Sequence, residues 1–115
     1  MIYLFESELP ENKSIFFALT HIFGIGKSNS LFLCKTLGFS PNLKLKTMSK
    51  EQIIKLVNII ESSTLIITGD LKKLKSQNLK TLFSIKSYKG LRLKQGLPVR
   101  GQRTHTNART ARKRR

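Results

Sequence analysis

The sequence predicts an all-α fold, with a small helical domain at residues 1–85 and a long, extended, basic C-terminal arm at residues 86–115. Two observations support this prediction. Apolar residues recur at helical spacing in several segments before residue 85. The arm contains eleven Lys or Arg, no Asp or Glu, and all seven arginines of the chain. Its glycines and Pro98 are expected to break any helix or strand that starts there.

The chain opens with a short apolar lead-in, residues 1–12, which we interpret as extended. A first helix is predicted from residue 12 or 13 to about residue 23, because one face of it would be apolar. The residues of that face are Ile15, Ala18, Leu19, Ile22 and Phe23.

A second helix is predicted at residues 28–37, after the interrupting sequence Gly-Ile-Gly-Lys. It ends at Gly38, because glycine commonly occupies the left-handed position after a helix. Its apolar residues are Leu31, Leu33, Cys34 and Leu37. Residues 39–47 are then predicted to form a loop anchored by Leu43 and Leu45.

Two further helices complete the predicted domain. Ser49 and Gln52 match a capping box, in which a serine cap and a side chain three residues later satisfy each other's backbone N–H groups. After a β-branched connector at residues 62–69, Asp70 is the candidate N-cap of the last helix. The exposed face of that helix carries Lys72 and Lys73.

The net charge of +16 is unevenly distributed. Residues 1–85 use eleven lysines and no arginine, whereas the arm is rich in arginine interleaved with Gly, Thr, Asn and Gln. Arginine binds phosphate bidentately and stacks on bases, which lysine does not do. The arm offers little apolar surface to offset its conformational entropy, so we expect a polyanion to order it. Nucleic acid, RNA in particular, is the predicted partner, and no membrane association is expected.

The turn from Gly24 to Lys27 is a candidate phosphate site. Two residues without a Cβ allow the backbone N–H groups of a helix N-terminus to approach a phosphate. An ordinary tight turn between helices would have the same sequence, and the motif is not a Walker loop.

The sequence does not predict an enzyme. Its six carboxylates are scattered, mostly where helix capping explains them, and neither His21 nor His105 is part of a recognisable nucleophile, base and orienter. Cys34 is the sole cysteine, so we expect no internal disulfide and no thiolate metal site. We also expect no cofactor and no other metal site.

The run from Gly96 to Thr110, GLPVRGQRTHTNART, resembles the C-terminal signature of small-subunit ribosomal protein number thirteen of bacterial or organellar type. The segments 18–27 and 69–71 are also similar to that family. The resemblance implies a helix–two-turn–helix arrangement in the domain. It also implies a structural role in the head of the small ribosomal subunit.

The partners implied by the resemblance are small-subunit rRNA, ribosomal protein nineteen, elements of an intersubunit bridge to the large subunit, and tRNA in the peptidyl site. From the resemblance and the charge pattern together, the residues expected to bind rRNA are Gly24, Gly26, Lys27, Lys72, Lys73, Arg92, Lys94, Arg100, Gly101, Arg103, Thr104, Asn107, Arg109 and Thr110. Those expected to approach tRNA are Arg112, Lys113, Arg114 and Arg115.

Two alternatives remain open. A helix–hairpin–helix DNA-binding protein would also use the glycine turn and the positive charge, and a DNA-repair enzyme could share the helical fold. Compartment is inferred from composition, which is rich in Lys, Ile, Leu, Phe and Asn as in AT-biased organellar genomes, and from an N-terminus unlike a transit peptide. We therefore expect an organelle-encoded protein of a mitochondrial ribosome, with a bacterial cytoplasm or a plastid as the alternative.

Overall fold

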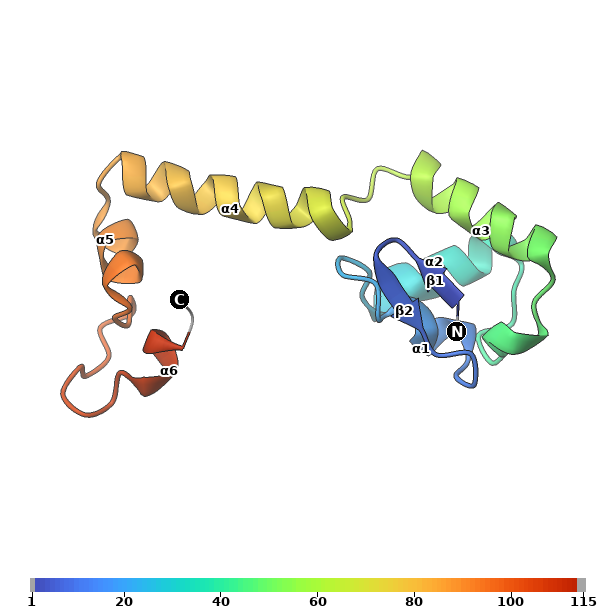
Figure 1. Ribbon diagram of the computed structural model, residues 1–115, viewed down its shortest axis with the longest axis horizontal. Coiled ribbons are helices and arrows are strands. Elements are labelled where there is room, and N and C mark those ends of the chain that lie inside the picture. Colours follow the sequence, from blue (N-terminus) through green and yellow to red (C-terminus); the bar gives the residue numbers. More distant parts are fainter. Residues whose placement is uncertain (1, 114–115) are drawn as a thin grey trace. The chain divides into compact units, whose positions relative to one another are not determined.

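The computed structural model describes residues 2–113 and is mostly helical, with one small sheet (Figure 1). The chain forms two compact units, Met1–Lys72 and Lys73–Arg115, which we call the N-terminal and C-terminal units. The prediction of an all-α fold is confirmed in its main feature.

The predicted extended lead-in is a β-hairpin. Strands β1 (Ile2–Leu4) and β2 (Ser7–Leu9) pair antiparallel, with Ile2 opposite Leu9. The two turn residues, Phe5 and Glu6, have φ values of 47° and 58°. Two successive positive φ angles are typical of the turn that matches strand twist in a tight hairpin. Leu9 is fully buried and ties the hairpin to the core.

Helix α1 (Ile15–Leu19) is shorter than predicted. The expected helix to residue 23 is wrong, because the chain tightens after Leu19. There the N–H of Ile22 donates to the carbonyl of Leu19, three residues back rather than four. Ile22 is still buried, but Phe23 is 41% exposed and does not belong to the core.

Helix α2 (Lys27–Leu37) and its glycine stop are confirmed. Gly38 has φ 69°, and the N–H of Phe39 reaches back to the carbonyl of Cys34. A positive φ costs glycine little, because it has no Cβ to clash with the backbone. The chain then continues through the loop to a short 3-10 helix, η1 (Leu45–Thr47), where Leu45 is buried.

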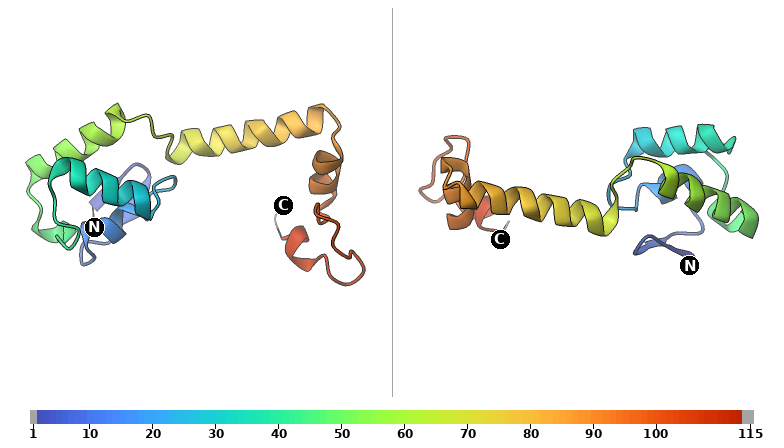
Figure 2. Two further views of the ribbon diagram at one scale, coloured as in Figure 1. Left: turned by 180° about the vertical axis from the view of Figure 1, so that it is seen from behind. Right: turned by 90° about the horizontal axis from the view of Figure 1, so that it is seen from above.

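The capping box at the start of α3 (Lys50–Ser62) is also confirmed. Gln52 N–H donates to the Ser49 hydroxyl, and the Ser49 N–H donates to the Gln52 side chain. Helix α3 buries Leu56 and Ile60. Figures 1 and 2 show α1, α2, α3 and the hairpin gathered in the N-terminal unit. Its core, formed from all these elements, consists of Leu9, Ile15, Ala18, Leu19, Ile22, Ile25, Leu33, Cys34, Leu45, Met48, Leu56 and Ile60.

Helix α4 (Thr68–Ser84) begins earlier than predicted. Asp70 lies in its first turn and is not the N-cap, so that prediction is wrong. Thr68 has φ 47°, and its N–H donates to the Phe23 carbonyl oxygen over 2.7 Å. This bond joins the start of α4 to Phe23, in the segment between α1 and α2.

The C-terminal arm is more ordered than its composition indicates. Within the described residues it contains α5 (Tyr88–Gln95) and α6 (Arg109–Arg112), joined by a loop that Figure 2 shows from behind. The expectation that glycine and proline break every helix in the arm is wrong for α5, in which Gly90 is buried. Gly96 has φ 71° and ends α5, as a glycine after a helix does.

Candidate nucleic-acid interface

Positive charge is concentrated in the C-terminal unit. Of the 22 Lys and Arg residues of the chain, fourteen follow Lys72, and none of the six carboxylates does. The N-terminal unit has eight lysines beside all six carboxylates. The charge therefore divides between the units even more sharply than between the predicted domain and arm. A field of one sign over so small a unit attracts polyanions and raises their association rate.

The glycine turn has one residue that faces inward. A Cβ built on Gly24 would lie 3.0 Å from the carbonyl oxygen of Ile66 and 3.1 Å from the Cα of Ile67. Gly24 also has φ 108°, which side chains rarely adopt. Because Gly24 has no side chain, the turn can pack against the connector that leads into α4.

The other half of the turn is open. Gly26 is the N-cap of α2, and a Cβ there would meet nothing within 4 Å. The first turn of α2 has no acidic residue, and Lys27 is exposed at its first position. The N–H groups of a helix start and the helix dipole favour an anion at such a position. Gly26 and Lys27 thus have the geometry expected of a phosphate contact.

Lys72 lies beside this turn. Its Nζ is 6.0 Å from the centre of the Phe23 ring, which directly precedes Gly24. A cation at this distance from an aromatic face is weakly attracted to it. The structure therefore brings Lys72 to the Gly24–Lys27 turn, whereas Lys73, also exposed, belongs to the C-terminal unit.

Arg92 is less available than the sequence indicates. Its guanidinium carbon lies 5.6 Å from the centre of the Tyr88 ring, and its Nε is buried without a hydrogen-bond partner among the described residues. Lys94 on the same helix is exposed. Part of the Arg92 side chain is therefore in contact with Tyr88 inside α5.

The loop between α5 and α6 carries most of the predicted arm residues. Arg100, Gly101, Arg103, Thr104 and Asn107 are all exposed. Ala108, which directly follows them, is 1% exposed and anchors the end of the loop within the C-terminal unit.

Helix α6 presents the remaining predicted residues. Arg109, Thr110, Arg112 and Lys113 are exposed on it or directly after it. Arg114 and Arg115 lie outside the described residues.

The structure forms a groove of about 940 Å³ inside the C-terminal unit. It brings together four of the predicted residues, Lys94, Arg100, Asn107 and Thr110. Three further lining residues, Phe83, Lys89 and Gln102, were missed as site residues. Phe83 lies in α4, and the spacing of its apolar residues does not distinguish a residue packed in a core from one that lines a groove.

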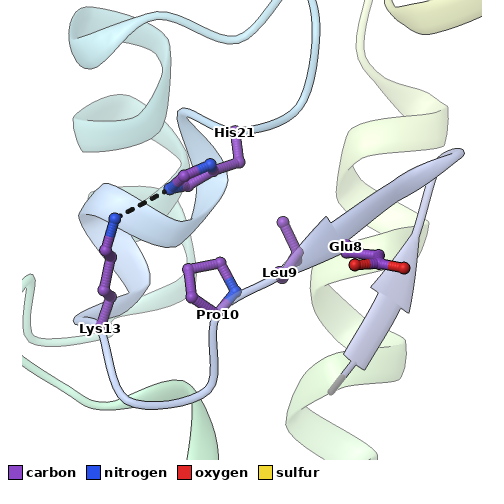
Figure 3. A pocket seen from close by; sticks show the side chains of 5 residues that line it. All are labelled: Glu8, Leu9, Pro10, Lys13 and His21. Carbon is purple, nitrogen blue, oxygen red and sulfur yellow. Dashed lines mark hydrogen bonds between the residues drawn. The ribbon is translucent and has the colours of Figure 1, made fainter.

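A smaller cavity of about 190 Å³ lies at the foot of the hairpin (Figure 3). Lys13 Nζ and His21 Nε2 are 3.3 Å apart there and point toward one another, while Glu8 lies beyond Leu9 and Pro10 in this view. His21 is exposed and pairs with a lysine, which makes neither a nucleophile nor its base.

Residues 2–113 contain neither a metal cluster nor a membrane-spanning helix. Among these residues no group of three or more His, Cys, Asp or Glu could hold a metal ion. Within the same range no helix is long and apolar enough to cross a membrane.

Comparison with known proteins gives one family. The family model described as ribosomal protein S13/S18 matches residues 3–110. The small ribosomal subunit protein uS13 of Akkermansia muciniphila is 44% identical over 110 residues, covering 96% of this chain and 88% of that protein. The uS13c protein of Gracilaria tenuistipitata var. liui is 47% identical over 91% of this chain and 82% of its own. The uS13m protein of Marchantia polymorpha is 42% identical over 98% of this chain and 93% of its own.

Proposed function

Because the chain belongs to the ribosomal protein S13/S18 family, and is thus a structural protein of the small ribosomal subunit that associates with rRNA, we propose that it holds the rRNA through two basic surfaces. One is the turn from Gly24 to Lys27 with Lys72 beside it. The other is the arm, residues 86–115. In this proposal residues 1–85 dock the protein on one RNA site and the arm contacts a second one.

The observation that carries the proposal is the charge of the C-terminal unit. Fourteen Lys and Arg and no Asp or Glu lie in this unit, and four of the five arginines that the structure describes there are exposed. Guanidinium groups on an irregular loop can adapt to the irregular phosphate path of folded RNA, and each can bind phosphate with two parallel hydrogen bonds. The exposed Thr104 and Asn107 add neutral hydrogen-bonding groups among them.

Further partners follow from the family resemblance. We propose that the chain lies beside ribosomal protein nineteen in the head of the small subunit. The N-terminal unit would take part in a bridge to the large subunit, and Arg112, Lys113 and the two arginines after them would approach tRNA in the peptidyl site. The family is a structural one without enzymatic activity, and we propose no catalytic role for this chain.

Among ribosomes we propose a mitochondrial one. The support is the Lys-, Ile- and Asn-rich composition, together with a mitochondrial-type relative that covers 98% of the chain. Bacterial and plastid relatives have similar identities, so a bacterial or a plastid ribosome is the alternative. Mass spectrometry of ribosomes purified from isolated mitochondria tests this compartment directly.

Binding to two nucleic acids at equal salt tests the RNA role. The full chain should bind a folded rRNA fragment from the small-subunit head more tightly than duplex DNA of equal length. The DNA-binding alternative predicts equal affinity for the two. Replacing Arg100, Arg103 and Arg109 by lysine keeps the net charge and removes the bidentate geometry, so it should weaken rRNA binding more than DNA binding.

A further inference from the structure

The arm folds back on the end of α4, and two glycines make this possible. Gly90 is buried so close to the α4 end that a Cβ there would lie 2.5 Å from the Leu82 carbonyl oxygen. Ser87 joins the two helices, since its hydroxyl donates to that same carbonyl and accepts from the Gly90 N–H. After Gly96 the chain reverses, and the Leu97 N–H donates to the Arg92 carbonyl. The loop to α6 thereby faces α4 and α5 across the groove.

The groove combines three kinds of side chain. Its apolar wall includes Phe83 and Leu79 of α4, which are 39% and 42% exposed, and the half-buried Leu93 of α5. Cations line it from both sides, with Lys89 on α5 and Arg100 on the loop. The loop also contributes two carboxamides, those of Gln102 and Asn107.

We propose that this groove holds an unstacked nucleobase of single-stranded RNA, with the base against the Phe83 ring. The proposal rests on the rRNA-binding function proposed above and names one contact within it. An aromatic ring offers a stacking surface to any base, and carboxamides offer both a donor and an acceptor to a base edge. The two cations can contact the phosphates on either side of the base.

Charge complementarity favours this occupant over an apolar peptide. No Asp or Glu lies in the unit, so no acidic side chain there repels a phosphate or pairs with a basic partner. The volume of about 940 Å³ lies near the top of the range of about 300–1,000 Å³ typical of pockets for small organic molecules, which leaves room for a base with its sugar and phosphate. The competing occupant is an acidic peptide. Such a peptide would pair with the cations but would not stack a base on the Phe83 ring.

The test compares two aromatic residues of the same unit in the full chain. Phe83→Leu removes the ring and keeps an apolar side chain, while Tyr88→Leu removes an exposed ring that does not line the groove. The probes are a short single-stranded oligouridylate and the same strand paired with oligoadenylate. Phe83→Leu should lower affinity for the single strand about tenfold, as loss of one base stack does. It should leave the slope of affinity against salt unchanged, because no phosphate contact is lost.

A second measurement uses the unaltered chain and so does not depend on a variant that folds. An oligouridylate with one 5-iodouridine is photo-crosslinked, and the attached residue is found by mass spectrometry. Attachment at Phe83 supports the groove. Attachment at Tyr88 alone, or equal affinities of Phe83→Leu and Tyr88→Leu, overturns it. If the groove is overturned while rRNA binding persists, the proposed function stands, whereas loss of preference for rRNA over DNA defeats that function itself.

Discussion

Gly90 and Leu82 are in backbone contact at the junction of α4 and α5. A Cβ on residue 90 would lie 2.5 Å from the Leu82 carbonyl oxygen and 2.8 Å from its carbon, which is closer than packed atoms approach. The C-terminal unit therefore depends on a glycine in the first turn of α5, where a larger residue would meet the Leu82 carbonyl.

Gly90→Ala should destabilise this junction, because the clash with backbone outweighs the gain in helix propensity. Overpacking costs about 1–3 kcal/mol, which corresponds to roughly 5- to 150-fold in local opening. Hydrogen exchange of the Leu91 and Leu97 amides, both bonded within the junction and α5, measures it. Gln95→Ala on the same helix is the control and should leave exchange nearly unchanged. Slower exchange in Gly90→Ala would show that α5 does not pack on Leu82.

Gly24→Ala should destabilise the N-terminal unit by about 2 kcal/mol or more, because it combines a strained φ with contact against the connector. Gly26→Ala should cost less than about 1 kcal/mol, since its φ of −94° suits any residue and its surroundings are open. Urea unfolding followed by circular dichroism compares the two variants. Equal losses would contradict the inward role of Gly24.

Ser49→Ala should lower the free energy of unfolding by about 1 kcal/mol, because the Gln52 N–H loses its partner at the start of α3. Ser76→Ala, in the exposed middle of α4, should be neutral or slightly stabilising. The midpoints of their thermal transitions give the comparison. A Ser49→Ala protein as stable as the Ser76→Ala protein would mean that the capping box contributes nothing.

Stability should also depend on Cys34 at alkaline pH. Burial raises the pKa of the Cys34 thiol above its ordinary value of 9.0. A raised pKa in the folded state gives stability that is present below the unfolded pKa and is lost as pH rises toward the folded one. Above about pH 9 the free energy of unfolding should fall by up to about 1.4 kcal/mol per pH unit more than in Cys34→Ala. Parallel pH profiles of both proteins would contradict this.

Local sequence rules predicted the parts of the fold that depend on local interactions. The glycine stop at Gly38 and the Ser49–Gln52 box are each complete within a few residues, so their patterns suffice. The start of α4 at Thr68 involves a bond between Phe23 and Thr68, which are distant in sequence. No spacing of apolar residues reports such a bond.

Helix α5 is an element that local sequence rules did not predict. Gly90 argued against a helix, yet its contact with Leu82 is what positions α5. The site was predictable in its charge, because arginine content is a property of composition. The groove was not, because it requires the reversal at Gly96 to bring the loop opposite Phe83. Both α5 and the groove depend on tertiary contacts.

Salt dependence of binding tests the central claim, that the C-terminal unit binds rRNA through its phosphates. Affinity of the full chain for a small-subunit rRNA fragment is measured over a range of salt concentrations. If the arm makes about eight phosphate contacts, log affinity should fall against log salt with a slope of about −6 to −7, at roughly −0.7 to −0.9 per contact. A slope shallower than about −2 would contradict the claim, because it would correspond to only about two or three neutralised phosphates.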